Sequence, residues 1–154
     1  MSSLNIVKEP NPILRQKTKE IKEITSEIKR LIFDMAETMK KNKGIGLAAN
    51  QVGQDVKLCL ISTEKGHLAL INPKITWKSL RKEVEEEGCL SCPNVWGLVK
   101  RPKIIYVKAL NQDNKTIKFR AEGLFSRVIQ HEVDHLNGIL IIDKFVKKQK
   151  KVIL

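Results

Sequence analysis

The chain of 154 residues carries 29 lysine and arginine side chains against 17 aspartate and glutamate side chains, a formal net charge of +12. Its length and its mixture of 42% hydrophobic and 30% charged residues exclude a disordered or membrane-spanning chain and favour one soluble domain over residues 1–154. The charge is typical of a solvated surface, although it would also attract anionic partners. Residues 146–154 are rich in lysine, and we expect them to form a basic, loosely held C-terminal tail.

The N-terminus has neither a secretory signal nor an Arg-rich transit peptide, so we expect a cytoplasmic protein. Three cysteines, Cys59, Cys89 and Cys92, are too few for a disulfide framework. This number suits a reducing compartment, in which thiolates remain able to bind metal.

The first predicted helix is amphipathic and spans residues 25–42. Thr25 or Ser26 can cap its start, and Gly44 lies just beyond its end, where a residue that tolerates positive φ is favoured. Apolar side chains follow helical spacing at Ile28, Leu31, Ile32, Met35, Ala36 and Met39.

Four short, apolar and partly β-branched runs in the middle of the chain predict strands. These runs are residues 57–62, 68–71, 104–110 and 116–121. A polar turn at residues 111–114 joins the last two runs into an antiparallel hairpin. A second helix is predicted over residues 123–138. This order of elements indicates an α+β fold with mostly antiparallel sheets packed around the C-terminal helix.

The C-terminal helix carries a pattern typical of metal-assisted hydrolysis, His131-Glu132-Val133-Asp134-His135. Two histidines four positions apart lie on one face of a helix and can hold a divalent cation. Glu132 can reach a water bound to that cation and take its proton.

A catalytic site of this kind needs a third protein ligand and an open position for water. Cys89 is the best candidate, because a thiolate is a strong ligand and Gly88 would relieve backbone crowding beside the metal. His67 is the only other histidine, and we expect it in an exposed polar turn. Cys92 completes a Cys-x-x-Cys pair that could form a metal knuckle or a redox dithiol, but we favour a small buried apolar residue.

A glycine-rich segment covers residues 44–51 and ends in Gln51. It lacks the Gly-Lys-Ser/Thr ending of a phosphate loop and the spacing of a dinucleotide fingerprint. Small residues instead allow a substrate backbone to come close, and Gln51 could donate a hydrogen bond into the site.

These three segments together resemble the motifs of the peptide deformylases, which remove the formyl group from the N-terminal formylmethionine of new bacterial polypeptides. Residues 44–51 match the first motif, 87–91 the second and 131–135 the third, in the family's order. The resemblance extends from residues 11–14 to about Phe145.

The resemblance implies that Cys89, His131 and His135 hold one metal ion per chain, Fe²⁺ in this family, with Zn²⁺, Ni²⁺ or Co²⁺ as possible substitutes. It implies that metal-bound hydroxide attacks the formyl carbon, with Glu132 as general base and then general acid. It also assigns the oxyanion to the Gln51 amide and the Leu90 backbone N–H.

The family's substrates imply nascent formyl-Met polypeptides as partners, with transient ribosome association as a hypothesis, and neither membrane nor specific DNA. By resemblance the substrate lies against Ile45, Gly46 and Gly88, and Val128 lines the methionine pocket. Glu87 and Arg101 resemble an ion pair that fixes the ligand-bearing loop. Two departures from the family pattern, Trp96 and Arg127, are expected to alter peptide preference.

Two alternatives remain open. A zincin-like peptidase would use the same histidine pair but would recruit a downstream ligand, for which Asp143 is the only carboxylate. A metal-stabilised basic module that binds RNA or the ribosome would make Glu132 incidental.

Overall fold

The computed structural model describes the backbone of residues 3–152 and the side chains of residues 3–146. Its two α-helices are α1 (Ser26–Lys41) and α2 (Gly123–Leu136), and its short 3₁₀ helices are η1 (Pro12–Arg15), η2 (Ala49–Val52) and η3 (Ile141–Asp143). Its strands are β1 (Gly46–Ala48), β2 (Leu58–Thr63), β3 (Gly66–Lys78), β4 (Lys82–Cys89), β5 (Cys92–Pro102), β6 (Ile104–Leu110), β7 (Thr116–Glu122) and β8 (Phe145–Val152). Among the helices of this described part, none is long and apolar enough to cross a membrane.

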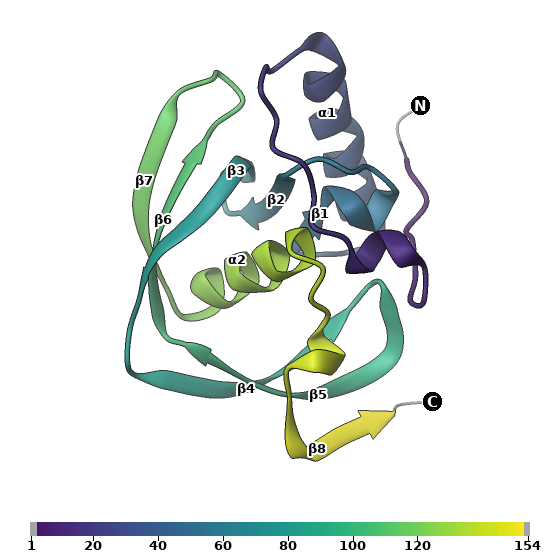
Figure 1. The fold of residues 1–154 in the computed structure, drawn as a ribbon, viewed down its shortest axis with the longest axis vertical. Helices are drawn as coiled ribbons and strands as arrows, with labels where there is room; N and C mark the ends of the chain where they lie inside the picture. Colours follow the sequence, from purple (N-terminus) through teal and green to yellow (C-terminus); the bar gives the residue numbers. More distant parts are fainter. Residues whose placement is uncertain (1–2, 153–154) are drawn as a thin grey trace.

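The strands form two antiparallel sheets with α2 between them, which confirms the predicted α+β class. One sheet has the order β1-β2-β3-β6-β7 and the other the order β4-β5-β8. Figure 1 shows α2 in the centre of the molecule, with the five-stranded sheet on one side and β4 and β5 on the other. The residues of α2 are therefore positioned by packing from both sheets.

Strand β2 is buried on both faces because a helix covers each side of the larger sheet. Leu58 and Leu60 pack in one hydrophobic cluster with Met35 of α1. Cys59 and Ile61 point the other way and pack in a second cluster with α2. The continuous apolar run of β2 follows from this arrangement, since alternate residues of a strand face opposite sides of the sheet.

Helix α1 begins after Thr25, whose hydroxyl accepts a hydrogen bond from the backbone N–H of Ile28 at 3.2 Å. The left-handed residue beyond its end is Lys43, with φ of 57°, and not Gly44 as the sequence suggests. Gly44 instead donates its backbone N–H to Met39 O at 2.9 Å, which closes the end of the helix.

The smaller sheet has no counterpart among the strands predicted from the sequence. β4 reads Lys-Glu-Val-Glu-Glu-Glu-Gly-Cys, which offers almost no apolar alternation, and it forms by pairing with β5. The region expected to be a loose basic tail forms β8 up to Val152 and pairs with β5, while residues 153 and 154 lie outside the described part. His67, expected in a turn, is exposed but lies in β3.

Candidate metal centre

Helix α2 carries two histidines and a glutamate at the heart of the site. His131 and His135 are four residues apart, so that their rings lie on one face of the helix with centroids 5.0 Å apart. Glu132 is 4% exposed and lies directly after the first histidine. The i, i+4 spacing expected from the sequence therefore brings the two rings together.

Cys89 reaches these histidines from the other sheet, at the end of β4. Its Sγ lies 3.2 Å from Nε2 of His135, and the potential ligand atoms of Cys89, His131 and His135 all lie within 4.8 Å of one another. Leu90 and Ser91 form the tight turn that follows, and Cys92 is the cross-strand partner of Cys89 in β5. The turn between the two strands thus presents the Cys89 sulfur to α2.

Cys92 takes no part in this group of ligand atoms. It is 5% exposed and packs in a hydrophobic cluster with Leu14, Leu140 and Ile141. Together with burial, its thiol raises the pKa of Cys89 above the ordinary value for cysteine. The structure favours the interpretation of Cys92 as a buried apolar residue.

The two histidines differ in their electrostatic environment. Nδ1 of His131 lies 3.1 Å from Oε1 of Glu87, which leaves the opposite ring nitrogen to face the cluster. Burial lowers the pKa of His131, but the carboxylates of Glu132 and Glu87 outweigh it and raise this pKa above its usual value. Burial and the neighbouring His131 lower the pKa of His135 well below its usual value, which favours a neutral ring.

Glu87 anchors a buried network of ion pairs beneath His131. Arg101 binds it twice, with Nε 2.7 Å from Oε2 and Nη2 3.0 Å from Oε1. Arg127 adds a third contact of 2.6 Å, and Arg101 also binds Asp134 of α2 at 2.8 Å. Burial alone would raise the pKa of Glu87, but hydrogen bonds from His131 and Arg101 lower it to about 2. The carboxylate is therefore ionised near neutral pH.

Arg127 was expected to alter peptide preference, and this stays a prediction. It borders the cavity, but its side chain is 10% exposed and its guanidinium binds Glu87. It also donates to the backbone oxygens of Val99 and Glu83, at 2.9 and 2.8 Å. Arg127 therefore ties α2 to the smaller sheet.

Gln51 and Leu90 lie on the side of the cavity formed by η2 and the β4–β5 turn. Gln51 is 2% exposed; its Oε1 accepts from the backbone N–H of Ala48 at 2.9 Å. Its Nε2 donates to Ser91 Oγ at 3.1 Å and lies 3.7 Å from the Cys89 sulfur. The amide N–H groups of Gln51 therefore point towards the cluster of ligand atoms.

The buried carboxylate of Glu132 is held beside the backbone of β1. A Cβ atom added to Gly46 would lie 2.5 Å from Oε2 of Glu132 and 2.9 Å from Cγ1 of Val128. Burial raises the pKa of Glu132 to about 7. Among the described residues its Oε1 has no hydrogen-bond partner, although it is buried. A group placed so can accept and return a proton near neutral pH.

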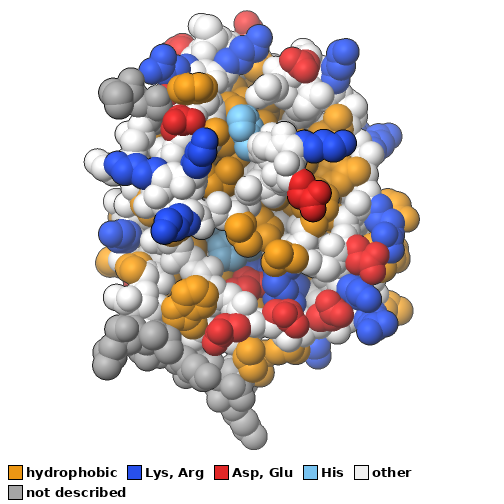
Figure 2. Space-filling view, turned by 180° about the vertical axis from the view of Figure 1, so that it is seen from behind, with side chains coloured by type: hydrophobic (Ala, Val, Ile, Leu, Met, Phe, Trp, Pro, Cys, Tyr) orange, Lys and Arg blue, Asp and Glu red, His pale blue; other side chains and the backbone are white. Residues whose placement is uncertain are grey.

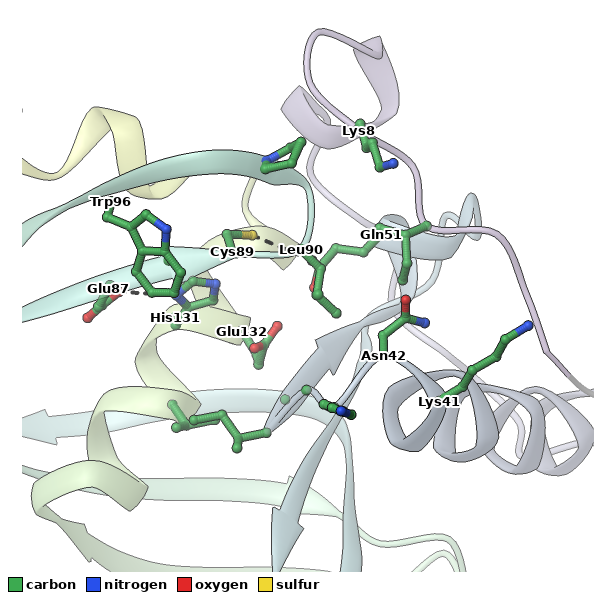
Figure 3. A pocket seen from close by; sticks show the side chains of 18 of the residues that line it. Lys8, Lys41, Asn42, Gln51, Glu87, Cys89, Leu90, Trp96, His131 and Glu132 are labelled. Carbon is green, nitrogen blue, oxygen red and sulfur yellow. Dashed lines mark hydrogen bonds and ion pairs between the residues drawn. The ribbon is translucent and has the colours of Figure 1, made fainter. Parts of the chain in front are cut away.

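The site opens into a cavity of about 1010 Å³, seen from close by in Figure 3. Glu132, His131, Cys89 and Gln51 line it, together with Ile45, Gly46, Gly88, Leu90 and Val128. Every substrate-binding residue expected from the sequence therefore borders one cavity. Val128 also belongs to the hydrophobic core between α2 and the larger sheet.

Trp96 stands over Gly88 at one end of this cavity. A Cβ atom at Gly88 would overlap the indole ring, so a larger residue there would displace Trp96. The side chain of Trp96 is close to half exposed, and Figure 3 shows it on the same side as Glu87 and His131.

Figure 2 shows basic side chains spread over one face of the molecule with acidic ones between them, so the charge of this face is not gathered in one patch.

Three contacts that fix the site were not foreseen from the sequence. Asn50 donates its side-chain amide to the backbone oxygen of His135 at 2.6 Å, which ties η2 to α2. Asp134 binds Arg101, and Ser91 accepts from Gln51. The only signal in the sequence was that Asn50, Asp134 and Ser91 lie within or next to the motifs.

The donor set fits a bound divalent metal. One thiol and two imidazoles from separate elements converge, as in catalytic sites with three protein ligands. The unpartnered, buried Oε1 of Glu132 beside them is an independent sign, because a buried polar atom of this kind normally has a partner. Asp143, the downstream ligand that a zincin would need, instead binds Arg15 and the backbone N–H of Leu140.

This fold and this site define a metal-dependent hydrolase. The polypeptide deformylase family model matches residues 3–151. A peptide deformylase of Halothermothrix orenii is 44% identical over 155 residues, which cover 99% of this chain and 100% of the relative. A peptide deformylase of Desulforudis audaxviator is 41% identical over 145 residues, 94% of each chain. The chain belongs to the polypeptide deformylase family.

Solved structures agree with this assignment. The crystal structure of peptide deformylase from Thermotoga maritima is similar with a TM-score of 0.92 and 38% identity, covering 95% of this chain and 99% of that chain. The crystal structure of a peptide deformylase from Synechococcus elongatus in complex with actinonin has a TM-score of 0.91 and 40% identity, and the match covers 95% of this chain and 80% of that chain. The family resemblance seen in the motifs is thereby confirmed.

Proposed function

We propose that this chain removes the N-formyl group from the N-terminal formylmethionine of newly made polypeptides and releases formate. The observation that carries the proposal is the position of Glu132, a buried carboxylate with a pKa of about 7 beside a group of three metal-ligand atoms. Peptide deformylases of 41 to 44% identity support the choice of substrate. Such a substrate would place the activity in the cytoplasm.

Cys89, His131 and His135 would hold the metal, and Glu87 would orient His131 through the 3.1 Å contact to Nδ1. When bound, a divalent cation supplies Lewis-acid chemistry: it polarises the formyl oxygen and lowers the pKa of water. We propose Fe²⁺ as the resident ion, with Zn²⁺, Ni²⁺ or Co²⁺ as substitutes, because a thiolate and imidazoles suit each of them. Metal analysis of chain purified without oxygen would distinguish these ions.

Proton transfer is assigned to Glu132. Its carboxylate takes a proton from the attacking water and later gives that proton to the departing amine of methionine. The pKa of about 7 suits both steps, since the group can be deprotonated and reprotonated near neutral pH. Burial keeps bulk water from exchanging this proton during the reaction.

The negative charge that develops on the formyl oxygen would be stabilised by the Gln51 amide and the backbone N–H of Leu90. Gln51 is suited to this role because its Oε1 is held by the Ala48 N–H, which fixes the orientation of the amide. Loss of one such donor typically costs about 10²-fold or more in rate.

The peptide would lie extended along the free edge of β1. This strand is at the end of the larger sheet, and Ile45 O accepts from Ser62 N at 2.8 Å on the β2 side. Successive residues of a strand direct their backbone groups to opposite edges, so Gly46 directs its own groups towards the cavity. Val128 would contact the methionine side chain, and Gly88 would border the peptide on the opposite wall.

The discriminating experiment measures formate release from formyl-Met-Ala-Ser together with metal content, under anaerobic conditions. We expect turnover by the metal-loaded chain, and loss of both metal and turnover in Cys89→Ala. A fully loaded chain that releases no formate would refute the proposal. Cleavage of casein by that same chain would instead favour a peptidase.

We also propose transient association with the ribosome, supported only by the net charge of +12 and by the lysines of residues 147–151. Deletion of these residues would remove part of β8, so glutamine substitutions at Lys147, Lys148, Lys150 and Lys151 are the better test. Equal co-sedimentation with ribosomes before and after substitution would refute this role for the tail.

A further inference from the structure

The cavity of the metal centre has a basic end that the proposed chemistry does not use. Lys8, Lys41 and Lys43 line it, and all three are exposed. Figure 3 shows Lys8 and Lys41 on the side of the cavity opposite Trp96. The nearest acidic groups of the lining, Glu86, Glu87 and Glu132, belong to the other end and to the site itself.

The three lysines come from two separate elements and have no acidic partner among the described side chains within 4.0 Å. Lys41 ends α1 and Lys43 follows it. Lys8 lies in the N-terminal segment, which is fixed to the β4–β5 turn because Glu9 N donates to Ser91 O at 2.9 Å. The cavity therefore has, on two walls, lysines that form no ion pair with the described side chains.

The direction of a bound peptide follows from what is buried around Gly46. The formyl end must lie at Glu132, beside Gly46. Beyond Gly46 the chain continues into Leu47 and Ala48, both fully buried, so a peptide cannot extend along them. The opposite direction, past Ile45 and Gly44 to Lys43, remains open along the cavity.

The spacing of an extended chain sets which substrate residues meet the lysines. Lys43 precedes Gly46 by three residues and has a left-handed backbone, so the separation is at most the about 10 Å that three extended residues span at about 3.3 Å each. A peptide whose formyl group lies at Gly46 reaches that distance at its third or fourth residue.

We propose that Lys8, Lys41 and Lys43 determine specificity, favouring nascent chains with Asp or Glu at the third or fourth position. This inference rests on the proposed deformylase function and adds a charge preference to it. Lysine and carboxylate groups meeting at the mouth of the cavity attract each other through water, so the preference is moderate and depends on salt.

The test compares kcat/KM for formyl-Met-Ala-Asp-Asp and formyl-Met-Ala-Asn-Asn, both with an amidated C-terminus. Amidation matters because a free terminal carboxylate would itself meet the lysines and mask the side-chain effect. We expect the acidic peptide to be favoured about 5- to 10-fold at low salt, with a smaller ratio at 0.5 M salt.

The Lys8→Gln, Lys41→Gln, Lys43→Gln triple variant should reduce this ratio to about one. A matched control replaces Lys74, Lys108 and Lys118 with Gln, which removes the same charge from exposed positions of the larger sheet outside the cavity. The control should keep the wild-type ratio. Calorimetric affinities of the deformylated peptides for the metal-loaded chain should show the same pattern without turnover.

A wild-type ratio of one, or an acidic preference that survives in the cavity variant, would overturn the inference while leaving the deformylase function intact. An equal loss of preference in both triple variants would assign the effect to net charge and would also overturn it. Absence of formate from every peptide, including the neutral one, would instead refute the proposed function.

Discussion

Gly46 and Glu132 lie so close that the Glu132 carboxylate takes up the space that a side chain at position 46 would need. A Cβ atom there would lie 2.5 Å from Oε2 of Glu132. The glycine of β1 thus leaves room for the carboxylate of α2, and it also brings the open edge of the strand next to the proposed proton acceptor. This relationship links the first and third motifs in space.

Substitution of Gly46 by alanine should reduce turnover by about 10²-fold, because the added methyl group displaces the Glu132 carboxylate and the edge of β1. The metal ligands are untouched, so metal content should stay at the wild-type level. Steady-state kinetics of formate release, together with metal analysis, would measure both effects.

Gly44→Ala is the matched control. Its Cβ atom would meet the Leu90 side chain at 3.3 Å, a tight contact that a flexible side chain can relieve, and Gly44 does not have positive φ. We expect a much smaller loss of turnover than in Gly46→Ala. Equal losses in the two variants would mean that the close approach of Gly46 to Glu132 is not the cause.

Glu132→Gln should retain the metal and lose about 10²- to 10⁴-fold in kcat. Glutamine has nearly the same shape, but it cannot accept and return the proton that the proposed reaction requires. Formate release close to the wild-type rate in the metal-loaded variant would rule out Glu132 as the general base.

Glu87→Gln should destabilise the metal-free chain by about 3–5 kcal/mol, because it leaves the buried guanidinium groups of Arg101 and Arg127 without their carboxylate. Urea unfolding at pH 7 would measure the change. Asp34→Asn, which removes an exposed helical ion pair with Arg30, should cost only about 0.5 kcal/mol. Similar losses of unfolding free energy in the two variants would contradict a stabilising role for the buried network around Glu87.

The contribution of Glu87 should also depend on pH in a defined direction. The pKa of its carboxyl group is lowered from 4.5 to about 2 in the folded chain, so the folded state favours the ionised form. The stabilisation is complete above about pH 4.5 and is lost as the pH falls towards 2, a total of about 3 kcal/mol. The difference in unfolding free energy between wild type and Glu87→Gln should therefore not narrow from pH 7 to 5, where protonation of His131 strengthens its contact with Glu87, and should narrow below pH 4.5. A difference that narrows already between pH 7 and 5 would contradict the lowered pKa.

Helix α2 and the convergence of its two histidines could be predicted well because the pattern is local. His131, Glu132 and His135 lie within five residues, and helical geometry alone brings the two rings together. Strand β6 was also predicted with the bounds that the structure has, since an apolar, β-branched run carries its own signal.

The smaller sheet could not be predicted in the same way. Five of the first six residues of β4 are charged, Val84 is its only aliphatic residue, and the strand ends in Gly-Cys. Nothing in this local pattern indicates a strand. Its position depends on pairing with β5, which contains Pro93 and Gly97. Cys89 was predicted as a ligand because a thiolate binds metal well. That β4 brings it close to α2 depends on the tertiary fold, which the local sequence pattern does not reveal.

Arg127 illustrates the same limit. In the sequence it is a basic residue next to Val128 in the predicted helix. The sequence does not reveal that its side chain binds Glu87 and the backbone of β5. The lysines of the cavity are similar, because Lys8 and Lys41 line the same cavity only after the N-terminal segment is placed beside the β4–β5 turn.

Cys92→Val should leave one metal ion per chain and should change stability by less than about 1.5 kcal/mol. Cys92 is packed among Leu14, Leu140 and Ile141, and an apolar replacement of similar volume can occupy that space. Cys89→Ala, by contrast, removes one of the three converging ligand atoms and should lose the metal. Metal analysis after dialysis of the two variants would separate a site with one thiolate from a two-thiolate knuckle. If Cys92→Val lost its metal while remaining folded by circular dichroism, the fourth position would belong to Cys92, and no position would remain open for the water that the proposed reaction consumes.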